Sequence, residues 1–170
     1  MKKKKWIISA VILALIIISQ FFQPKKNQSG FNQELDFFSF VNAPEKLKEK
    51  IIVSCYDCHS NNTNYPWYGR ITPVSYWISF HVIKGKDELN FSEWAEVKLK
   101  RKKRKLRYIC EEMQDRKMPL KSYILMHKEA ACTQEEIDEI CDWIETEVAL
   151  IPDAPRKKSR IHKSKTKNNK

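Results

Sequence analysis

Hydrophobic and polar positions divide the chain into an apolar N-terminal run and a series of shorter amphipathic stretches. Residues 6–22 are apolar apart from Ser9, Ser19 and Gln20, and four lysines precede them. Seventeen residues in a helix extend about 25 Å, which is just enough to cross a hydrocarbon core with little tilt. The pattern therefore predicts a membrane anchor over residues 1–22.

The sequence around this run favours an uncleaved anchor over a cleaved signal peptide, which stays the alternative. No small-x-small cleavage pattern stands near the end of the run, and no lipid-accepting cysteine follows it. The lysines at positions 2–5 would hold the N-terminus in the cytoplasm. We therefore expect a single-pass protein of the cytoplasmic membrane, with its domain on the periplasmic or extracytoplasmic side.

A polar linker over residues 23–42 is expected to lead into two amphipathic helices. The first covers residues 44–52, where apolar side chains recur four apart between charges. The second has Thr72 as its N-cap and Pro73 as its first residue, and it should stop around Gly85.

Two further helices complete an all-α domain over residues 43–151. Ser92 is the expected N-cap of a helix that runs to about residue 116, and Met-Pro breaks the pattern after it. The sequence Thr-Gln-Glu-Glu at 133 is a capping box that opens the last helix, which carries a continuous apolar stripe. Residues 152–170 are lysine-rich, cannot bury apolar area and are expected to be a disordered tail.

The net charge of +11 lies mainly in the two ends of the chain. Residues 2–5 and 156–170 hold twelve basic residues and no acid, which leaves 20 basic and 21 acidic residues between them. The domain is nearly neutral, so the charge argues against a nucleic-acid partner.

One internal run of the predicted helix 92–116 has six consecutive basic residues, which cover all sides of a helix. They form either a solvated surface or a docking patch for an acidic redox partner or anionic lipid headgroups. The run consists of Lys100, Arg101, Lys102, Lys103, Arg104 and Lys105.

The strongest chemical signal is Cys55-Tyr56-Asp57-Cys58-His59. Two cysteines three apart can both reach the vinyl groups of a haem, and the histidine beside them then faces the iron. This is the attachment pattern of c-type haem. It predicts one covalently bound haem c held by Cys55 and Cys58. His59 would bind the iron through Nε2, while its Nδ1 would donate to a backbone carbonyl.

Three other interpretations of this motif are open: a thioredoxin-like redox pair, half of a zinc site, and chance. A redox pair is expected beside alternating strands, and none are predicted here. A zinc site needs two further clustered ligands. The remaining cysteines form no second close pair; they are Cys110, Cys132 and Cys141.

Further motifs follow the haem signal in a fixed order, and together they resemble the bacterial haem-binding domain family. The resemblance spans residues 44 to about 147 and implies a small, cytochrome c-like helical domain that binds c-type haem outside the cytoplasm. It implies neither a substrate nor a partner. Cys110, Cys132 and Cys141 belong to none of its motifs, and two of them could form a disulfide. The motifs are Cys55-x-x-Cys-His-Ser60-Asn61-x-Thr63, Pro66-Trp67-Tyr68, Pro73-Val74-Ser75-x-Trp77, His81-Val82-x-x-Gly85, Leu89-Asn90-Phe91-Ser92-x-Trp94 and Met118-Pro119-Leu120-x-x-Tyr123 with Met126-His127.

The sixth iron ligand decides the function. Met118 is the first candidate, because Pro119 holds its loop and its place before the last helix resembles that of the methionine ligand in small cytochromes c. His81 is the alternative, and Met126, His127 or an open position come after it. A second set of side chains is expected to shield the haem edge and bind its propionates, or simply to pack in a loop: Trp67, Tyr68 and Arg70.

With both axial positions filled, the expected function is electron transfer with unidentified redox proteins, without catalytic residues. A haem-based sensor or a peroxidase-like protein with a labile or open sixth position is the alternative. A zinc-bound structural module is a third possibility.

Overall fold

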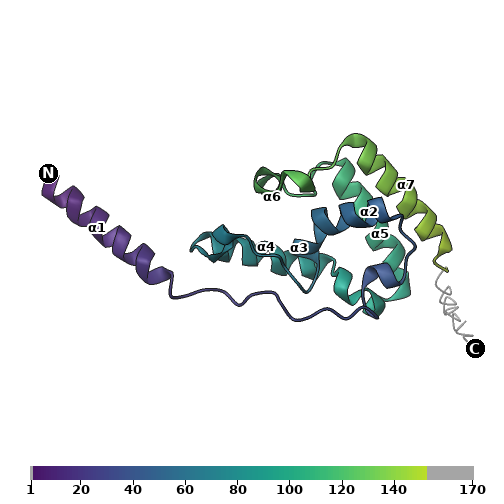
Figure 1. Cartoon of the computed structure of the whole chain (residues 1–170), viewed down its shortest axis with the longest axis horizontal. Helices are drawn as coiled ribbons and strands as arrows, with labels where there is room; N and C mark the ends of the chain where they lie inside the picture. Colours follow the sequence, from purple (N-terminus) through teal and green to yellow (C-terminus); the bar gives the residue numbers. More distant parts are fainter. Residues whose placement is uncertain (1, 153–170) are drawn as a thin grey trace, which may run out of the picture.

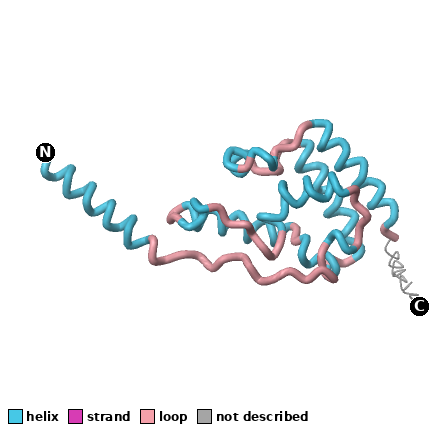
Figure 2. The backbone as a smooth tube through the Cα atoms, viewed as in Figure 1, coloured by secondary structure: helices cyan, strands magenta, loops and turns pink. Residues whose placement is uncertain are grey.

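The computed structural model describes residues 2–152, and within them every regular element is helical (Figures 1 and 2). This confirms the all-α class. The tail expected over 152–170 lies, apart from its first residue, outside the described residues. The helices are α1 (Lys2–Ser19), α2 (Glu45–Ile51), α3 (Asp57–His59), α4 (Val74–Glu88), α5 (Leu99–Gln114), α6 (Lys121–Met126) and α7 (Gln134–Leu150), with short turns η1 (Phe37–Ser39), η2 (Ile52–Tyr56), η3 (Trp67–Arg70), η4 (Phe91–Glu96) and η5 (Lys128–Ala130).

The hydrophobic core lies between α5 and α7, with α2, η1 and η4 completing it. At its centre Phe37 contacts the rings of Phe91, Trp94 and Trp143 at centroid separations of 5.1, 4.9 and 6.1 Å. The aromatic rings are close in tilted or edge-on geometry, which is the favourable arrangement for aromatic pairs. This core supports the helix that carries the cysteine motif.

Helix α1 differs from the predicted span. It takes the four lysines into its first turns and ends at Ser19, before Phe22, and its apolar side chains are exposed. No helix between residues 2 and 152 is both long enough and apolar enough to cross a membrane. The expected spanning helix over residues 6–22 is therefore not found. The helix that forms contains the four lysines at its start and leaves out the apolar residues Phe21 and Phe22.

Helix α4 begins after Pro73 and continues past Gly85 to Glu88. Thr72 is not its N-cap, so the predicted start was one residue early. The prediction that the helix stops at Gly85 was wrong, because Gly85 contacts a segment that is distant in the sequence. A Cβ at Gly85 would lie 2.7 Å from the carbonyl oxygen of Cys58, so the glycine serves a close helix contact rather than a helix end.

The single helix predicted over 92–116 is two elements. Asn90 caps the turn η4, and the chain is extended at Val97 and Lys98 before α5 begins. Ser92 does not cap α5, because its hydroxyl accepts a hydrogen bond from the backbone of Asn61. The connection after Met118 also holds a short helix, α6, that the sequence did not predict.

The stretch 23–42, predicted as a linker, makes specific contacts with the domain. Phe37 is 1% exposed at the centre of the core. Asn27 donates to the carbonyl of Ser60 and the hydroxyl of Thr63 at 2.8 and 2.9 Å, and its own carbonyl accepts from the Thr63 backbone. The chain before the motif is thus tied to the loop that follows it.

Candidate functional site

The cysteine motif lies at the end of a continuous helical segment from Glu45 to His59. The segment begins as α2, widens to a π-type turn in η2 and ends as α3. Such wide turns are frequent at functional sites. Cys55 lies in the wide turn and Cys58 in α3; both are free thiols and half-buried.

The motif forms one wall of an open groove with a cavity volume of about 220 Å³. Cys55, Cys58 and His59 line it together with Met118 and His81. The structure therefore brings both thiols, the imidazole and both candidate sixth ligands to one cavity. The other lining residues are Ser54, Lys84, Gly85, Glu88, Leu89, Phe91, Tyr108, Ile109, Glu112, Met113, Pro119, Leu120 and Tyr123.

His59 is held in the tautomer that a metal ligand needs. Its Nδ1 lies 3.0 Å from the carbonyl oxygen of Leu89, which can only accept a hydrogen bond. Nδ1 therefore carries the proton, and the lone pair is on Nε2. Burial lowers the pKa of His59, which also favours the neutral ring.

A polar cluster fixes the Leu89 carbonyl against the motif. The side chain of Asn61 accepts from Asn90 at 2.9 Å and donates to Glu93 at 2.9 Å, while its backbone amide donates to Ser92 at 3.0 Å. The loop after His59 and the segment after Leu89 are thus joined. Both segments belong to motifs noted in the sequence, Ser60-Asn61 and Asn90-Phe91-Ser92. Their physical role here is to hold in place the Leu89 carbonyl, which accepts the hydrogen bond from His59.

Burial also acts on the two thiols of the motif. It raises the pKa of Cys55 to about 12 and that of Cys58 to about 11, and Asp57 adds to the effect at Cys58. Both sulfurs are therefore protonated at neutral pH in the folded chain without cofactor.

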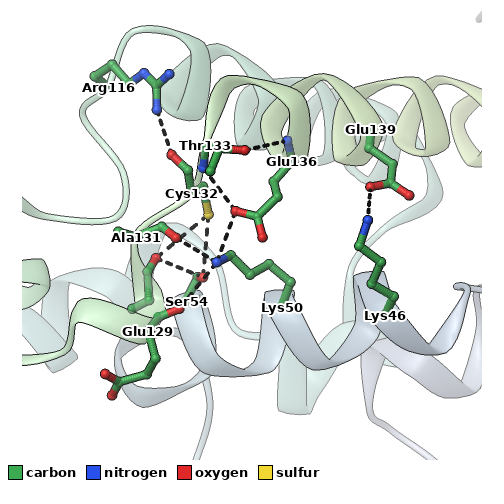
Figure 3. Close-up of polar contacts among 11 residues, drawn as sticks. Lys46, Lys50, Ser54, Arg116, Glu129, Ala131, Cys132, Thr133, Glu136 and Glu139 are labelled. Atoms are coloured by element: carbon green, nitrogen blue, oxygen red, sulfur yellow. Dashed lines mark hydrogen bonds and ion pairs between the residues drawn. The ribbon is translucent and has the colours of Figure 1, made fainter.

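A network of ion pairs and hydrogen bonds ties the motif helix to the start of α7 (Figure 3). Lys50 lies 3.1 Å from Glu136 and donates to the Ala131 carbonyl at 2.6 Å. Ser54, directly before the first motif cysteine, donates to the Ala130 carbonyl at 3.0 Å. Because Glu136 belongs to the capping box of α7, this network sets the motif relative to the last helix.

The candidate sixth ligands differ in their surroundings. Met118 is half-buried in the groove and precedes the buried Pro119. His81 is half-buried, and its Nδ1 lies 2.8 Å from the Trp77 carbonyl, which leaves a lone pair on its Nε2. Met126 is exposed and does not line the groove.

A second cavity, of about 290 Å³, adjoins the groove and shares with it the walls made by Cys58, His81, Leu120 and Tyr123. Tyr68 lines this second cavity, and its hydroxyl lies 2.9 Å from Nε2 of His127.

The other two residues expected at the haem edge, Trp67 and Arg70, line neither cavity and are exposed. Their role toward a haem stays a prediction.

Two residues without a predicted role are part of the site. The hydroxyl of Tyr123 donates to the Asp57 carboxylate at 2.8 Å, which connects α6 to the motif, and the ring of Tyr123 lines the groove. Met113 is a buried groove residue on α5. No local pattern in the sequence indicated the bond between Tyr123 and Asp57.

The three other cysteines are also free thiols. Cys110 and Cys141 are buried side by side, and their thiols are hydrogen-bonded to each other between α5 and α7. Cys132 lies 3.6 Å from the Ser54 hydroxyl. Within residues 2–152 no three metal-binding side chains of the His, Cys, Asp and Glu types gather, so the described chain offers no zinc site of that kind.

The basic run at 100–105 lies on α5. Lys102 covers the rings of Phe40 and Trp94 at 4.8 and 5.5 Å from their centroids, and its partial burial lowers its pKa. Lys105 donates to the Glu88 carbonyl. Part of the run therefore packs against the domain, and its role in docking stays a prediction.

The family comparison agrees with this site. The model of the haem-binding domain family matches residues 14–146, which include the motif, the groove and most of α7. Neither the curated proteins nor the solved structures contain a significant match to the chain.

Proposed function

Because this chain belongs to the haem-binding domain family, we propose that it holds a single haem c covalently and transfers electrons outside the cytoplasm. Thioether bonds from Cys55 and Cys58 would hold the group, and Nε2 of His59 would bind its iron. When bound, the haem supplies an iron that changes between the ferric and ferrous states.

The observation that carries this proposal is the convergence of donors on one groove. Two thiols, an imidazole whose lone pair is on Nε2, and a thioether line the same cavity. Its remaining walls are largely apolar, with Lys84 as a cationic side chain for a propionate. This donor set suits an axially ligated haem better than a redox pair, because burial disfavours both thiolates.

Met118 is the proposed sixth ligand. A thioether is a soft, neutral donor, and it would favour the ferrous state and raise the reduction potential. If both His59 and Met118 bind the iron, no position would be left for a small molecule, so the site would exchange electrons rather than bind small molecules.

The location of the domain is part of the same proposal. Helix α1 exposes its apolar side chains to solvent, with Ile and Leu residues about half exposed or more. Exposed apolar surface of this extent marks an interaction site. We propose that the N-terminal segment holds the chain at the cytoplasmic membrane, with Lys2–Lys5 on the cytoplasmic side.

Covalent attachment is tested by extracting the full chain, produced with a haem-attachment system, with acidified acetone. Haem should stay with the wild-type protein and be lost from the double variant that combines Cys55→Ser with Cys58→Ser. Cys132→Ser is the matched control, because its thiol lies near the motif without belonging to it, and it should keep its haem. Release from the wild type would show non-covalent binding and overturn the haem c assignment.

Axial ligation is tested by visible spectroscopy of the full-length holoprotein. The weak far-red charge-transfer band of ferric His/Met haem should disappear in Met118→Ala and persist in Met126→Ala, a methionine outside the groove. A spectrum indifferent to Met118→Ala would refute this ligand.

The alternative is a sensor or peroxidase-like protein with a labile sixth position. The observation that favours it is His81, whose side chain also lines the groove with its Nε2 lone pair free. Ready binding of carbon monoxide to the ferrous wild-type protein without denaturant would favour this alternative over electron transfer.

A further inference from the structure

An exposed aromatic and aliphatic surface covers one end of the domain, at the start of α4. On α4, Tyr76, Phe80 and Ile83 lie at spacings of four and three, so they share one face, while the buried Ser75 and Val82 lie on another. Large exposed apolar surfaces of this kind mark interaction sites. We call the exposed apolar residues between positions 67 and 83 the aromatic patch; they are Trp67, Ile71, Tyr76, Trp77, Phe80 and Ile83, and Trp77 also lines the second cavity.

The aromatic patch lies beside the end of α1. The side-chain amide of Gln20 donates to the Thr72 carbonyl at 3.2 Å, and its oxygen accepts from the Thr72 amide at 2.9 Å. Gln23 donates to the Thr72 hydroxyl at 2.9 Å. Figure 1 shows the chain leaving α1 close to the tip of α4. The C-terminal end of α1 therefore lies beside the start of α4, next to the aromatic patch.

The charges around this junction are positive. No Asp or Glu occurs between residues 58 and 86, and Lys25, Lys26 and Arg70 are exposed nearby. Trp and Tyr prefer the boundary between lipid headgroups and acyl chains, and basic residues there attract anionic headgroups. A bilayer can cover α1 and the aromatic patch at the same time, which a protein partner bound at the patch does not do.

We propose that the aromatic patch lies in the interfacial layer of a lipid bilayer. This inference rests on the proposed membrane attachment through α1. It adds a second contact, made by the folded domain itself, that fixes how the domain is oriented on the membrane.

The test is hydroxyl-radical footprinting of the full-length holoprotein with vesicles of phosphatidylcholine and phosphatidylglycerol, read by peptide mass spectrometry. Flotation first establishes vesicle binding. Oxidation of Trp67 and Trp77 should fall about fivefold or more on vesicle binding, as expected for side chains withdrawn into the interface. Tyr108, half exposed on α5, should be oxidised at the same rate with and without vesicles.

A paired variant separates the aromatic patch from α1. Phe80→Ser with Ile83→Ser removes two exposed patch residues that line neither cavity, so the haem spectrum should be unchanged while Trp77 regains its oxidation. The control Leu150→Ser, exposed at the end of α7, should leave the protection intact.

Each other outcome overturns the inference. Vesicle binding with Trp67 and Trp77 oxidised as in free protein would show that the patch faces water while the attachment through α1 stands. Protection that appears only when a second protein is added would assign the patch to a protein partner. Failure to float would refute both the attachment and the patch contact, while the haem assignment would stand on its own spectra.

Discussion

Gly85 is the residue whose substitution tests the site geometry most directly. It lies inside α4, where the helix passes the motif. A Cβ there would lie 2.7 Å from the carbonyl oxygen, 3.3 Å from the carbonyl carbon and 3.4 Å from the Cβ of Cys58. Since the closest atom belongs to the backbone, no side-chain rotation relieves the contact, and Gly85→Ala must push α4 and α3 apart.

Two opposing effects set how much Gly85→Ala changes the free energy of unfolding. Ordinary contact begins near 3.4 Å, so the two helices must separate by about 0.7 Å. Overpacking of this kind costs about 1–3 kcal/mol. Alanine recovers about 0.5–1 kcal/mol, because glycine is a poor residue inside a helix. Subtracting the second effect from the first leaves a net loss of about 1 kcal/mol, within a range of about 0–2.5 kcal/mol, and 1 kcal/mol corresponds to about 4–8 °C in Tm for a small domain.

The assay is thermal and urea unfolding of the full-length holoprotein, followed by circular dichroism. Gly69→Ala is the matched control. Its new Cβ would meet only side-chain atoms, the nearest being Cδ1 of Ile78 at 3.3 Å, so it should change the free energy of unfolding much less. If Gly85→Ala were as stable as the wild type, or more stable as helix propensity alone predicts, the close contact between α4 and the motif would be refuted.

Substitutions at three further places test other parts of the fold: the core, the cap of α7 and the contact between α6 and the motif. Phe37→Ala should lower the free energy of unfolding by about 3–5 kcal/mol, while Phe31→Ala, at an exposed residue, should change it little. Thr133→Ala should cost about 1 kcal/mol through the loss of the α7 cap. The Thr133 amide holds the pKa of Glu136 below its usual 4.5, so the advantage of the wild type over Glu136→Gln should be present above pH 4.5 and vanish as the pH falls through the folded pKa. Tyr123→Phe should cost about 1 kcal/mol by removing a hydrogen bond to the motif helix.

Urea unfolding measures all three. A Phe37→Ala protein as stable as Phe31→Ala would place the segment before residue 43 outside the core. A stability difference for Glu136→Gln that does not change with pH would refute the role assigned to its charge. If Tyr123→Phe unfolded like Tyr76→Phe, a change at an exposed tyrosine, the link from α6 to the motif would carry no stability.

The parts of the fold predicted from sequence are those determined by local chemistry. The capping box opens α7 as expected, because Thr133 and Glu136 satisfy each other's backbone amides within one turn. The motif Cys-x-x-Cys-His predicts a haem site through its spacing, and the match to the haem-binding domain family supports haem binding. The expectation that His59 donates to a backbone carbonyl is confirmed by Leu89.

The parts that were not predicted depend on distant contacts. A glycine such as Gly85 can mark either the end of a helix or a close approach of two backbones. Only the position of Cys58 in the folded chain shows that the second interpretation is correct. Ser92 has the composition of an N-cap but bonds to Asn61. Phe37 follows a polar stretch without periodicity, so its place in the core was not visible in the sequence.

The aromatic core has a consequence for the order in which the protein is assembled. Phe37 comes before the cysteines in sequence and Trp143 comes in the last helix, yet their rings pack together behind the motif. In the proposed export of the domain, the residues after α1 would cross the membrane in chain order, so that Cys55 and Cys58 would emerge well before Trp143. If the haem is attached as proposed, both thiols would be accessible to the attachment enzymes until α7 packs against the core.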